Sequence, residues 1–311
     1  MHRAEYGEQW PNFKHDVIAV MPFFPYAFWN EHCEVPKDTE LYGTSRNIYE
    51  RFRQFFLETK QILEVRYSIQ QLDFIIPLEH AALDRDKVAT IDLLRQKGLP
   101  VSETIPYTCL QDILDCVTPE RGVFVKCRYG AEGKGITVLH HGQWETNYDV
   151  QNRKLGNHGV YGTWPFVDIT GRTDLLEQLL QHEVIVEREI LSSSLFAGKK
   201  FDVRAYTVDE VVPYFFLRIN EPTKITTNIS QGAEALHNPH SIIPTEYSKA
   251  IQHTAVAAGR AFGSRFIGID MMFDGSVEGI KIVEAQTFTG FPFIDYFNLA
   301  QYMVQQSRLF L

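Results

Sequence analysis

Two acidic residues and an amide lie on apolar stretches near the end of the chain. Asp270 lies in FIGIDMMF, and the side-chain period of a strand places Glu284 and Gln286 on one face of IKIVEAQ. Their oxygens are hard ligands, which suit Mg²⁺ or Mn²⁺ better than Zn²⁺. The alternative is a pair of acids that face water from edge strands, but acids among apolar residues usually need a partner. Asp270, Glu284 and Gln286 are therefore candidate ligands of a divalent cation, and the pair of water-facing acids stays open as the alternative.

A lysine precedes a glycine-rich turn in VFVKCRYGAEGKG. Strand alternation places Lys126 on one face, and Gly130, Gly133 and Gly135 follow it. Glycines let backbone N–H groups approach phosphate oxygens, and a lysine adds a positive charge beside them. The pattern is not a Walker A loop, because GxxxxGK[ST] is absent and a strand follows the turn. Taken alone, it fits a glycine hairpin with a surface lysine better than a phosphate-binding loop.

A third set of residues is mainly basic. Asp202 and Arg204 share one face of KFDVRAYTV, Arg218 lies near the end of PYFFLRI, and Lys224 and Asn228 follow in TKITTNISQGAEA. Arginine forks bind phosphate or carboxylate in a bidentate manner, which favours an anion-binding cleft. A structural ion pair between Asp202 and Arg204 is the competing interpretation, and the local sequence leaves both open.

Histidine and serine clusters give weaker evidence for a functional site. His140–His141 and the pair His237 and His240 lack supporting carboxylates, so we interpret them as surface residues. Ser192–Ser194 lie in a segment that ends at Gly198, where flexibility is a simpler explanation than catalysis.

Composition excludes several classes of protein. The 311 residues include 30 Lys and Arg against 39 Asp and Glu, a net charge of −9, which argues against a general nucleic-acid binder. Hydrophobic residues make up 44% and charged residues 22%, so disorder and collagen-like repeats are excluded and a core is expected. The length suggests about two domains, or three small ones. Aromatic residues reach 13%, enough to line a binding surface with rings.

Cysteine spacing and hydropathy indicate a cytoplasmic protein. The cysteines show no CxxC spacing, and we interpret them as reduced, mostly buried thiols. Residues 1–14 contain no apolar segment typical of a secretion signal, and the longest apolar stretch is short and broken by Pro22 and Pro25. We expect neither a signal nor a membrane span. The cysteines are Cys33, Cys109, Cys116 and Cys127.

Helical and strand patterns alternate in an order typical of an α+β protein with antiparallel sheets. Residues 84–98 are predicted to form a helix, with Asp84 or Asp86 as its N-cap and Gly98 and Pro100 ending it. We expect strands at 17–20, 123–128, 136–139, 184–190, 200–208, 213–219, 266–273 and 280–286, helices at 47–65, 174–181, 245–262 and 294–309, and a long loop at 142–172.

The order of these motifs resembles the ATP-grasp superfamily from Leu83 to Pro292. DRDKVATIDLLRQKGLPVSET resembles its entry helix, VFVKCRYGAEGKGI its triphosphate-covering strand and loop, and VIVEREI its hinge strand. KFDVRAYTV, the arginine of FFLRI and TTNISQG are similar to the ribosomal-protein-S6 modification enzyme and tubulin–tyrosine ligase branches. GIDMMF and IVEAQ match the metal-binding strands, although the last motif usually has Glu-x-Asn and this chain has Gln286.

The resemblance implies an ATP-grasp fold in which two α+β subdomains hold a nucleotide. A small α/β domain at 1–115 would precede a central subdomain at 116–190 and a carboxy-terminal subdomain with the metal site at 191–311. Residues 1–80 and 142–172 would then carry the identity of the substrate.

The resemblance also implies a role for each candidate residue. Arg204 and Arg218 would stabilise an acyl phosphate and a tetrahedral oxyanion, and Asn228 would orient the γ-phosphate or the metal. Mg²⁺ or Mn²⁺ would be held by Asp270, Glu284 and Gln286, whose side chain is one methylene longer than that of the usual Asn. The ATP-binding set would be Lys87, Lys126, Gly133, Gly135, Glu187 at the adenine amino group, Arg188, Ile190, Lys200 and Asp202.

The implied activity is an ADP-forming ligase that joins a carboxylate to an amine through an acyl phosphate. The substrates would be amino acids, peptides or a carrier-borne carboxylate, with no nucleic-acid or membrane partner. Many such ligases form homodimers, and the sequence leaves the oligomeric state open. The alternatives are an ATP-grasp phosphotransferase that acts on a hydroxyl and a non-catalytic ATP-binding regulatory module.

Overall fold

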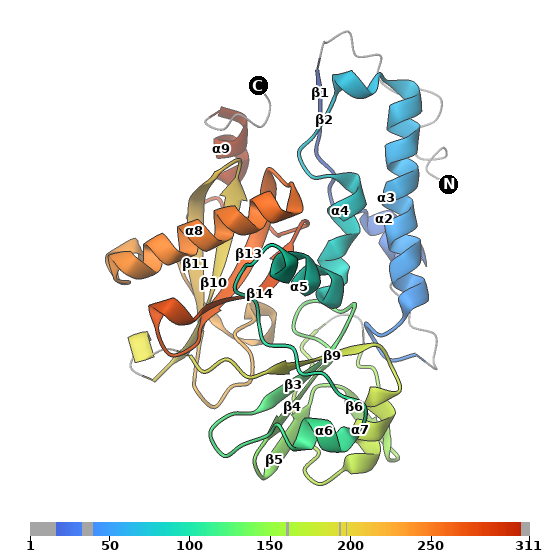
Figure 1. Ribbon diagram of the computed structural model, residues 1–311, viewed down its shortest axis with the longest axis vertical. Coiled ribbons are helices and arrows are strands. Elements are labelled where there is room, and N and C mark those ends of the chain that lie inside the picture. The colour runs from blue at the N-terminus through green and yellow to red at the C-terminus, as the bar shows by residue number, and fades with distance from the viewer. Residues whose placement is uncertain (1–16, 33–39, 160–161, 193, 197, 306–311) are drawn as a thin grey trace.

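Two five-stranded antiparallel sheets form the centre of the protein (Figure 1). This computed structural model describes residues 17–32, 40–159, 162–192, 194–196 and 198–305. The expectation of an α+β fold with antiparallel sheets is confirmed. Residues 1–14, which we expected to lack a signal, and Cys33 lie outside the described residues.

The first sheet lies at the bottom of Figure 1, with helices α6 (Leu110–Leu114) and α7 (Thr173–Leu180) beside it. Its strand order is β8-β5-β4-β3-β9. Trp164 and Leu175 are buried in the core that this sheet shares with α7. The strands are β3 (Val123–Cys127), β4 (Ile136–His140), β5 (Gln143–Thr146), β8 (Val167–Asp168) and β9 (Val184–Arg188).

The expectation of a long loop at 142–172 is wrong. This segment contains β5, β8 and a hairpin of β6 (Asp149–Gln151) and β7 (Lys154–Gly156), and β5 and β8 complete the edge of the first sheet. Each of these strands has only two to four residues, which is too short for an alternating pattern to stand out in a polar, glycine-rich sequence.

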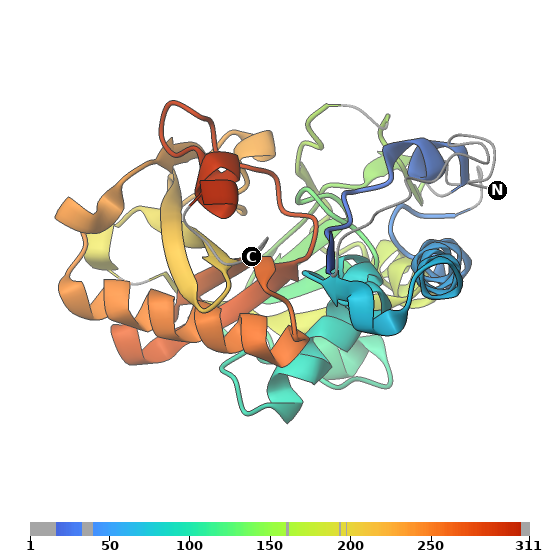
Figure 2. The same ribbon diagram turned by 90° about the horizontal axis from the view of Figure 1, so that it is seen from above.

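The second sheet has the order β12-β11-β10-β13-β14, and α8 lies along one of its faces (Figures 1 and 2). Phe201, Val203 and Ala205 point to that face and pack with Ile251 and Phe262 of α8. Because side chains alternate along a strand, the polar residues between them face the opposite side. The elements are β10 (Lys200–Val208), β11 (Val211–Asn220), β12 (Glu234–Leu236), α8 (Thr245–Phe262), β13 (Phe266–Phe273) and β14 (Ile280–Gln286).

The amino-terminal part packs against the segment that follows β14. A parallel pair, β1 (Ile18–Val20) and β2 (Leu72–Phe74), accompanies helices α2 (Tyr26–His32), α3 (Arg46–Arg66) and α4 (Leu78–Ala81). Phe52 and Phe56 of α3 are fully buried, and the ring of Phe56 stacks on Phe288 at 5.3 Å. Residues at opposite ends of the sequence therefore share one core.

The helix expected at 84–98 is α5 (Lys87–Gln96), preceded by a 3₁₀ turn at Ala82–Arg85. Asp86 is its N-cap, and its side chain accepts from the Ala89 N–H. The helix expected at 294–309 begins later, at Leu299, and α9 (Leu299–Gln305) reaches the last described residue. The other 3₁₀ turns are Ile69–Gln71, Ser194–Phe196, Ile229–Gln231, Pro239–Ser241 and Val277–Gly279.

Three of the four cysteines are described, and all three are free thiols. Cys127 is buried, Cys116 is half-buried and Cys109 is exposed, so the expectation of mostly buried thiols is wrong for this set. Helices within the described ranges do not combine the length and apolar character needed to cross a bilayer. The domain division at 115 and 190 stays a prediction.

Candidate active site

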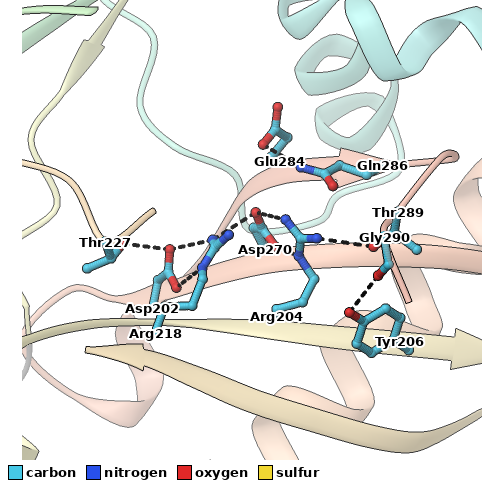
Figure 3. A network of polar contacts seen from close by, with 10 residues as sticks. All are labelled: Asp202, Arg204, Tyr206, Arg218, Thr227, Asp270, Glu284, Gln286, Thr289 and Gly290. Atoms are coloured by element: carbon cyan, nitrogen blue, oxygen red, sulfur yellow. Dashed lines mark hydrogen bonds and ion pairs between the residues drawn. The ribbon is translucent and has the colours of Figure 1, made fainter. Parts of the chain in front are cut away.

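Four charged side chains alternate in sign on the face of the second sheet opposite α8 (Figure 3). The register places Asp202 directly opposite Arg218, and Arg204 directly opposite Asp270. Directly opposed residues are the closest side-chain neighbours in an antiparallel sheet. The pairing of β10 with β11 and β13 therefore brings Asp202, Arg204, Arg218 and Asp270, here called the charge quartet, into one cluster.

Arg218 is the central member of the charge quartet. Its Nε and Nη2 each donate to Asp202 at 2.6 Å, and Nη2 also lies 2.9 Å from Asp270 Oδ2. Arg204 donates through Nη2 to the same Asp270 oxygen at 2.8 Å and through Nε to the other. The sequence allowed an ion pair between Asp202 and Arg204; the structure pairs each of them across the sheet instead.

The charge quartet is largely buried, and the pKa values of its two carboxyl groups shift in opposite directions. Burial alone would raise the pKa of Asp270, but the charges of Arg204 and Arg218 outweigh it and hold that pKa below its ordinary value. Burial raises the pKa of Asp202, although Arg218 and the Thr227 hydroxyl oppose the shift. Asp270 is thus the more strongly stabilised anion of the two.

Neighbouring groups fix the geometry of the charge quartet. The Thr227 hydroxyl donates to Asp202 Oδ2 at 2.7 Å, and Arg204 Nη1 donates to the Thr289 hydroxyl at 3.1 Å. Gly268 leaves room for Thr289, because a Cβ at that position would lie 2.4 Å from the threonine oxygen. These contacts fix the orientation of the side chains in the charge quartet.

The predicted metal ligands lie on the same face. Strand β14 pairs with β13, and Glu284 of β14 lies opposite Asp270 of β13. The register of this pairing shifts between Asp270 and Met271. Gln286 Nε2 donates to Glu284 Oε2 at 2.8 Å, and Lys87 Nζ lies 3.8 Å from Glu284 Oε1. Glu284 and Gln286 thus share one face, as the sequence predicts.

The donor chemistry of these residues fits a hard cation. Glu284 offers a carboxylate and Gln286 a carbonyl oxygen, but both oxygens of Asp270 accept from arginines. A cation that used Asp270 would have to share its oxygens with Arg204 and Arg218. Within the described ranges, no three His, Cys, Asp or Glu side chains gather as a metal cluster, and the predicted set contains only two such residues.

A smaller cavity of about 140 Å³ gathers eight of the nine predicted ATP-binding residues. Lys126 Nζ lies 2.6 Å from Glu187 Oε2, and the Ser102 hydroxyl donates to the other oxygen of Glu187. Burial lowers the pKa of Lys200. The eight residues are Lys87, Lys126, Gly133, Glu187, Arg188, Ile190, Lys200 and Asp202.

The ninth predicted residue, Gly135, does not line this cavity or the larger one beside it. A Cβ on Gly135 would lie 2.5 Å from Cys127 Sγ, so this glycine permits close packing beneath the loop. A Cβ on Gly133 would lie 2.6 Å from Asn228 Nδ2, and the Ser230 hydroxyl donates to Glu132 O at 3.2 Å. The glycine-rich loop therefore contacts the segment that carries Asn228.

The larger cavity, of about 900 Å³, adjoins the smaller one and is strongly aromatic. Arg218, Asn228 and Glu284 line both cavities. Arg204 and Gln286 line the larger one, so all three predicted catalytic residues and two predicted metal ligands border the larger cavity.

Sequence reasoning missed several residues of the larger cavity. Arg85 lies two positions before Lys87 in the DRDK motif, a signal that could have identified it. His237, interpreted as a surface residue, lines the cavity instead and stacks on Tyr296 at 3.6 Å. His140, also interpreted as a surface residue, is partly exposed and pairs with Glu189 at 3.1 Å.

Comparisons with known proteins identify a family. A family model described as YheC/D-like ATP-grasp matches residues 83–276, more than half of the chain. A search of curated proteins finds no match.

Solved structures with a similar fold include the ATP-grasp ligase PsnB in complex with a minimal precursor (14% identity, TM-score 0.45, 80% of this chain and 69% of that one). D-alanine–D-alanine ligase from Bacillus anthracis matches at 13% identity and TM-score 0.43, over 68% of this chain and 60% of that one. The ADP complex of purK, N5-carboxyaminoimidazole ribonucleotide synthetase, matches at 14% identity and TM-score 0.48, over 74% and 50%. This chain therefore spans less than two thirds of the latter two.

Proposed function

Because the chain belongs to the YheC/D-like ATP-grasp family, we propose that it is an ATP-dependent ligase that joins a carboxylate to an amine. In this proposal the carboxylate attacks the γ-phosphorus of ATP and ADP leaves, which gives an acyl phosphate. The amine then attacks the acyl carbon, the C–O bond to phosphate breaks, and an amide and free phosphate result.

The junction of the two cavities is the observation that carries the proposal. Lys87 and Lys126 line the smaller cavity, where their ammonium groups would hold the phosphates of the nucleotide. Arg218 and Asn228 line both cavities, so in this proposal they would contact a transferring phosphoryl group and its acceptor together. This arrangement suits a reaction between a nucleotide and a second bound substrate.

Arg204 and Arg218 would stabilise negative charge on the acyl phosphate and on the tetrahedral oxyanion. Within the described part of the chain, Arg218 donates to the carboxylates of the charge quartet through Nε and Nη2. Its Nη1 donors would therefore be available to a substrate. A divalent cation held by Glu284 and Gln286, with Asp270, would supply further charge neutralisation at the phosphates.

The test is a product analysis of the purified protein. It would be incubated with Mg²⁺-ATP and pools of amino acids and short peptides, and ADP, AMP, free phosphate and product mass would be measured. We expect ADP and phosphate that depend on the pool, with a product mass equal to a condensed pair. A phosphorylated product without free phosphate would indicate a phosphotransferase, and bound but unspent ATP a regulatory module.

Lys126→Ala tests the nucleotide site within the same assay. The variant should lose pool-dependent ADP release, because it lacks the ammonium group expected to contact the phosphates. Lys97→Ala, which removes an exposed lysine at the end of α5, is the matched control and should retain activity. Equal activity in the two variants would contradict the role of Lys126.

Gln286→Asn tests the metal role of the amide. If the Gln286 carbonyl is a ligand, the shorter side chain should keep or raise activity, because it restores the Glu-x-Asn pattern that the motif usually has. Initial rates at several Mg²⁺ concentrations would show this. Total loss would mean that the longer side chain has a specific role, such as its 2.8 Å hydrogen bond to Glu284.

A further inference from the structure

The larger cavity extends well beyond the charge quartet into a region walled by rings. Its volume of about 900 Å³ lies at the upper end for small-molecule sites. The rings come from both ends of the sequence, which the core around Phe52 and Phe288 holds together. They belong to Phe24, Tyr26, Trp29 and Tyr42 of the amino-terminal part, to Phe288, Phe291 and Phe293 after β14, and to Trp164, Tyr206 and Phe216 of the two sheets and their connections.

One cation lies among these rings. The guanidinium carbon of Arg85 is 4.9 Å from the ring centroid of Phe24 and 5.1 Å from that of Trp29. Arg85 Nε is buried and has no hydrogen-bond partner within the described ranges. A buried donor of this kind usually has a partner, and an acceptor group on a bound ligand would supply one.

The nearest acid does not fill this role. Asp84 Oδ2 lies 3.6 Å from Arg85 Nε, beyond hydrogen-bond distance, and Asp84 Oδ1 accepts from the Phe288 N–H at 3.2 Å. The other two arginines of the cavity, Arg204 and Arg218, already donate to the carboxylates of the charge quartet. Arg85 is thus set apart from them as a donor for an incoming anion.

Building on the ligase function above, we propose that the larger cavity binds the second substrate as a carboxylate attached to a bulky apolar or aromatic group, and that Arg85 binds that carboxylate. The rings would pack on the apolar group, and the guanidinium fork would bind the carboxylate. A small polar acid such as acetate would leave most of the ring surface without a partner.

The test is a binding experiment that needs no turnover. Isothermal titration calorimetry of the full chain would compare 4-phenylbutyrate, its neutral amide 4-phenylbutyramide, and acetate, with Mg²⁺-ADP titrated into the same preparations. We expect 4-phenylbutyrate to bind about tenfold or more tightly than either other probe, because a hydrogen bond to a charged group and the ring contacts both contribute.

Arg85→Met separates recognition from packing. It keeps an apolar stem beside Phe24 and Trp29 but removes the charge, so the preference for carboxylate over amide should disappear while amide and ADP binding stay unchanged. Arg85→Lys should restore part of the preference. Arg66→Met, at an exposed arginine at the end of α3, is the matched control and should bind like the unaltered protein.

Each other outcome decides against the inference. If Arg85→Met weakens the acid and the amide equally, Arg85 only supports the rings. If acetate binds as tightly as 4-phenylbutyrate, or if ADP binds and 4-phenylbutyrate does not, the substrate class is wrong while the proposed ligase function stands. If ADP does not bind at all, the proposed function itself is wrong.

Discussion

Glu284→Ala should abolish Mg²⁺-dependent ATP turnover and leave the fold intact. Glu284 is expected to supply a carboxylate oxygen to the cation, and neutralisation of phosphate charge by a cation contributes several kcal/mol to the barrier. A loss of about a thousandfold or more is expected, since each 1.36 kcal/mol changes the rate tenfold. Steady-state ADP release as a function of Mg²⁺ concentration would measure it.

Stability should change little in the same variant. The Glu284 side chain is 24% exposed, and its contacts are one amide hydrogen bond and a 3.8 Å ion pair with Lys87. Such partly solvated contacts contribute about 1 kcal/mol or less, so thermal unfolding should be nearly unchanged. Glu246→Ala, at an exposed glutamate in the first turn of α8, is the control. Undiminished activity in Glu284→Ala would disprove the metal assignment.

The sequence predicts the individual strands well because each carries its own pattern. In KFDVRAYTV, Phe201, Val203 and Ala205 alternate with Asp202 and Arg204, and the structure buries the first set against α8. Likewise, Glu284 and Gln286 share a face because a strand has a period of two. Such local features need no knowledge of which strands pair.

Pairing between strands is what the sequence alone could not supply. Arg204 faces Asp270, 66 positions away, and Asp202 faces Arg218, so the basic set and the metal set form one cluster rather than two. Register depends on how the two strands meet, and nothing local to either strand encodes it. This is why the sequence left an Asp202–Arg204 pair open.

The aromatic cavity could not be predicted from the sequence for a related reason. Phe24 and Phe288 lie at opposite ends of the chain, and their rings are 5.7 Å apart only in the folded protein. A high aromatic content indicated ring-lined surface but not its position. Arg85 lies among these rings, whereas the same residue on a solvated helix would donate its hydrogen bonds to water.

Arg218→Met should destabilise the protein as well as inactivate it, in contrast to Glu284→Ala. Arg218 donates to both carboxylates of the charge quartet, and its removal leaves Asp202 buried with the Thr227 hydroxyl as its one side-chain partner among the described residues. Breaking a buried ion pair by removing one partner costs about 3 to 5 kcal/mol. Urea unfolding should show this loss, and ATP turnover should disappear.

A second substitution distinguishes buried charge from lost packing. Arg218→Met combined with Asp202→Asn removes both charges of the pair, and the carbonyl oxygen of the introduced amide could still accept from the Thr227 hydroxyl. The double variant should therefore recover a large part of the lost free energy of unfolding, because no unpaired charge stays buried. Turnover should stay absent, since the donors that we propose Arg218 supplies at the oxyanion are still missing.

The control for this pair is Arg260→Met, which removes an exposed arginine that contacts Glu210 at 2.9 Å on the surface. Exposed ion pairs contribute little, so this variant should unfold at the same urea concentration as the unaltered protein. If the double variant is no more stable than Arg218→Met alone, the destabilisation comes from lost packing of the arginine stem. In that case the charge balance of the quartet does not stabilise the sheet face, and Arg218 stabilises it through the packing of its stem.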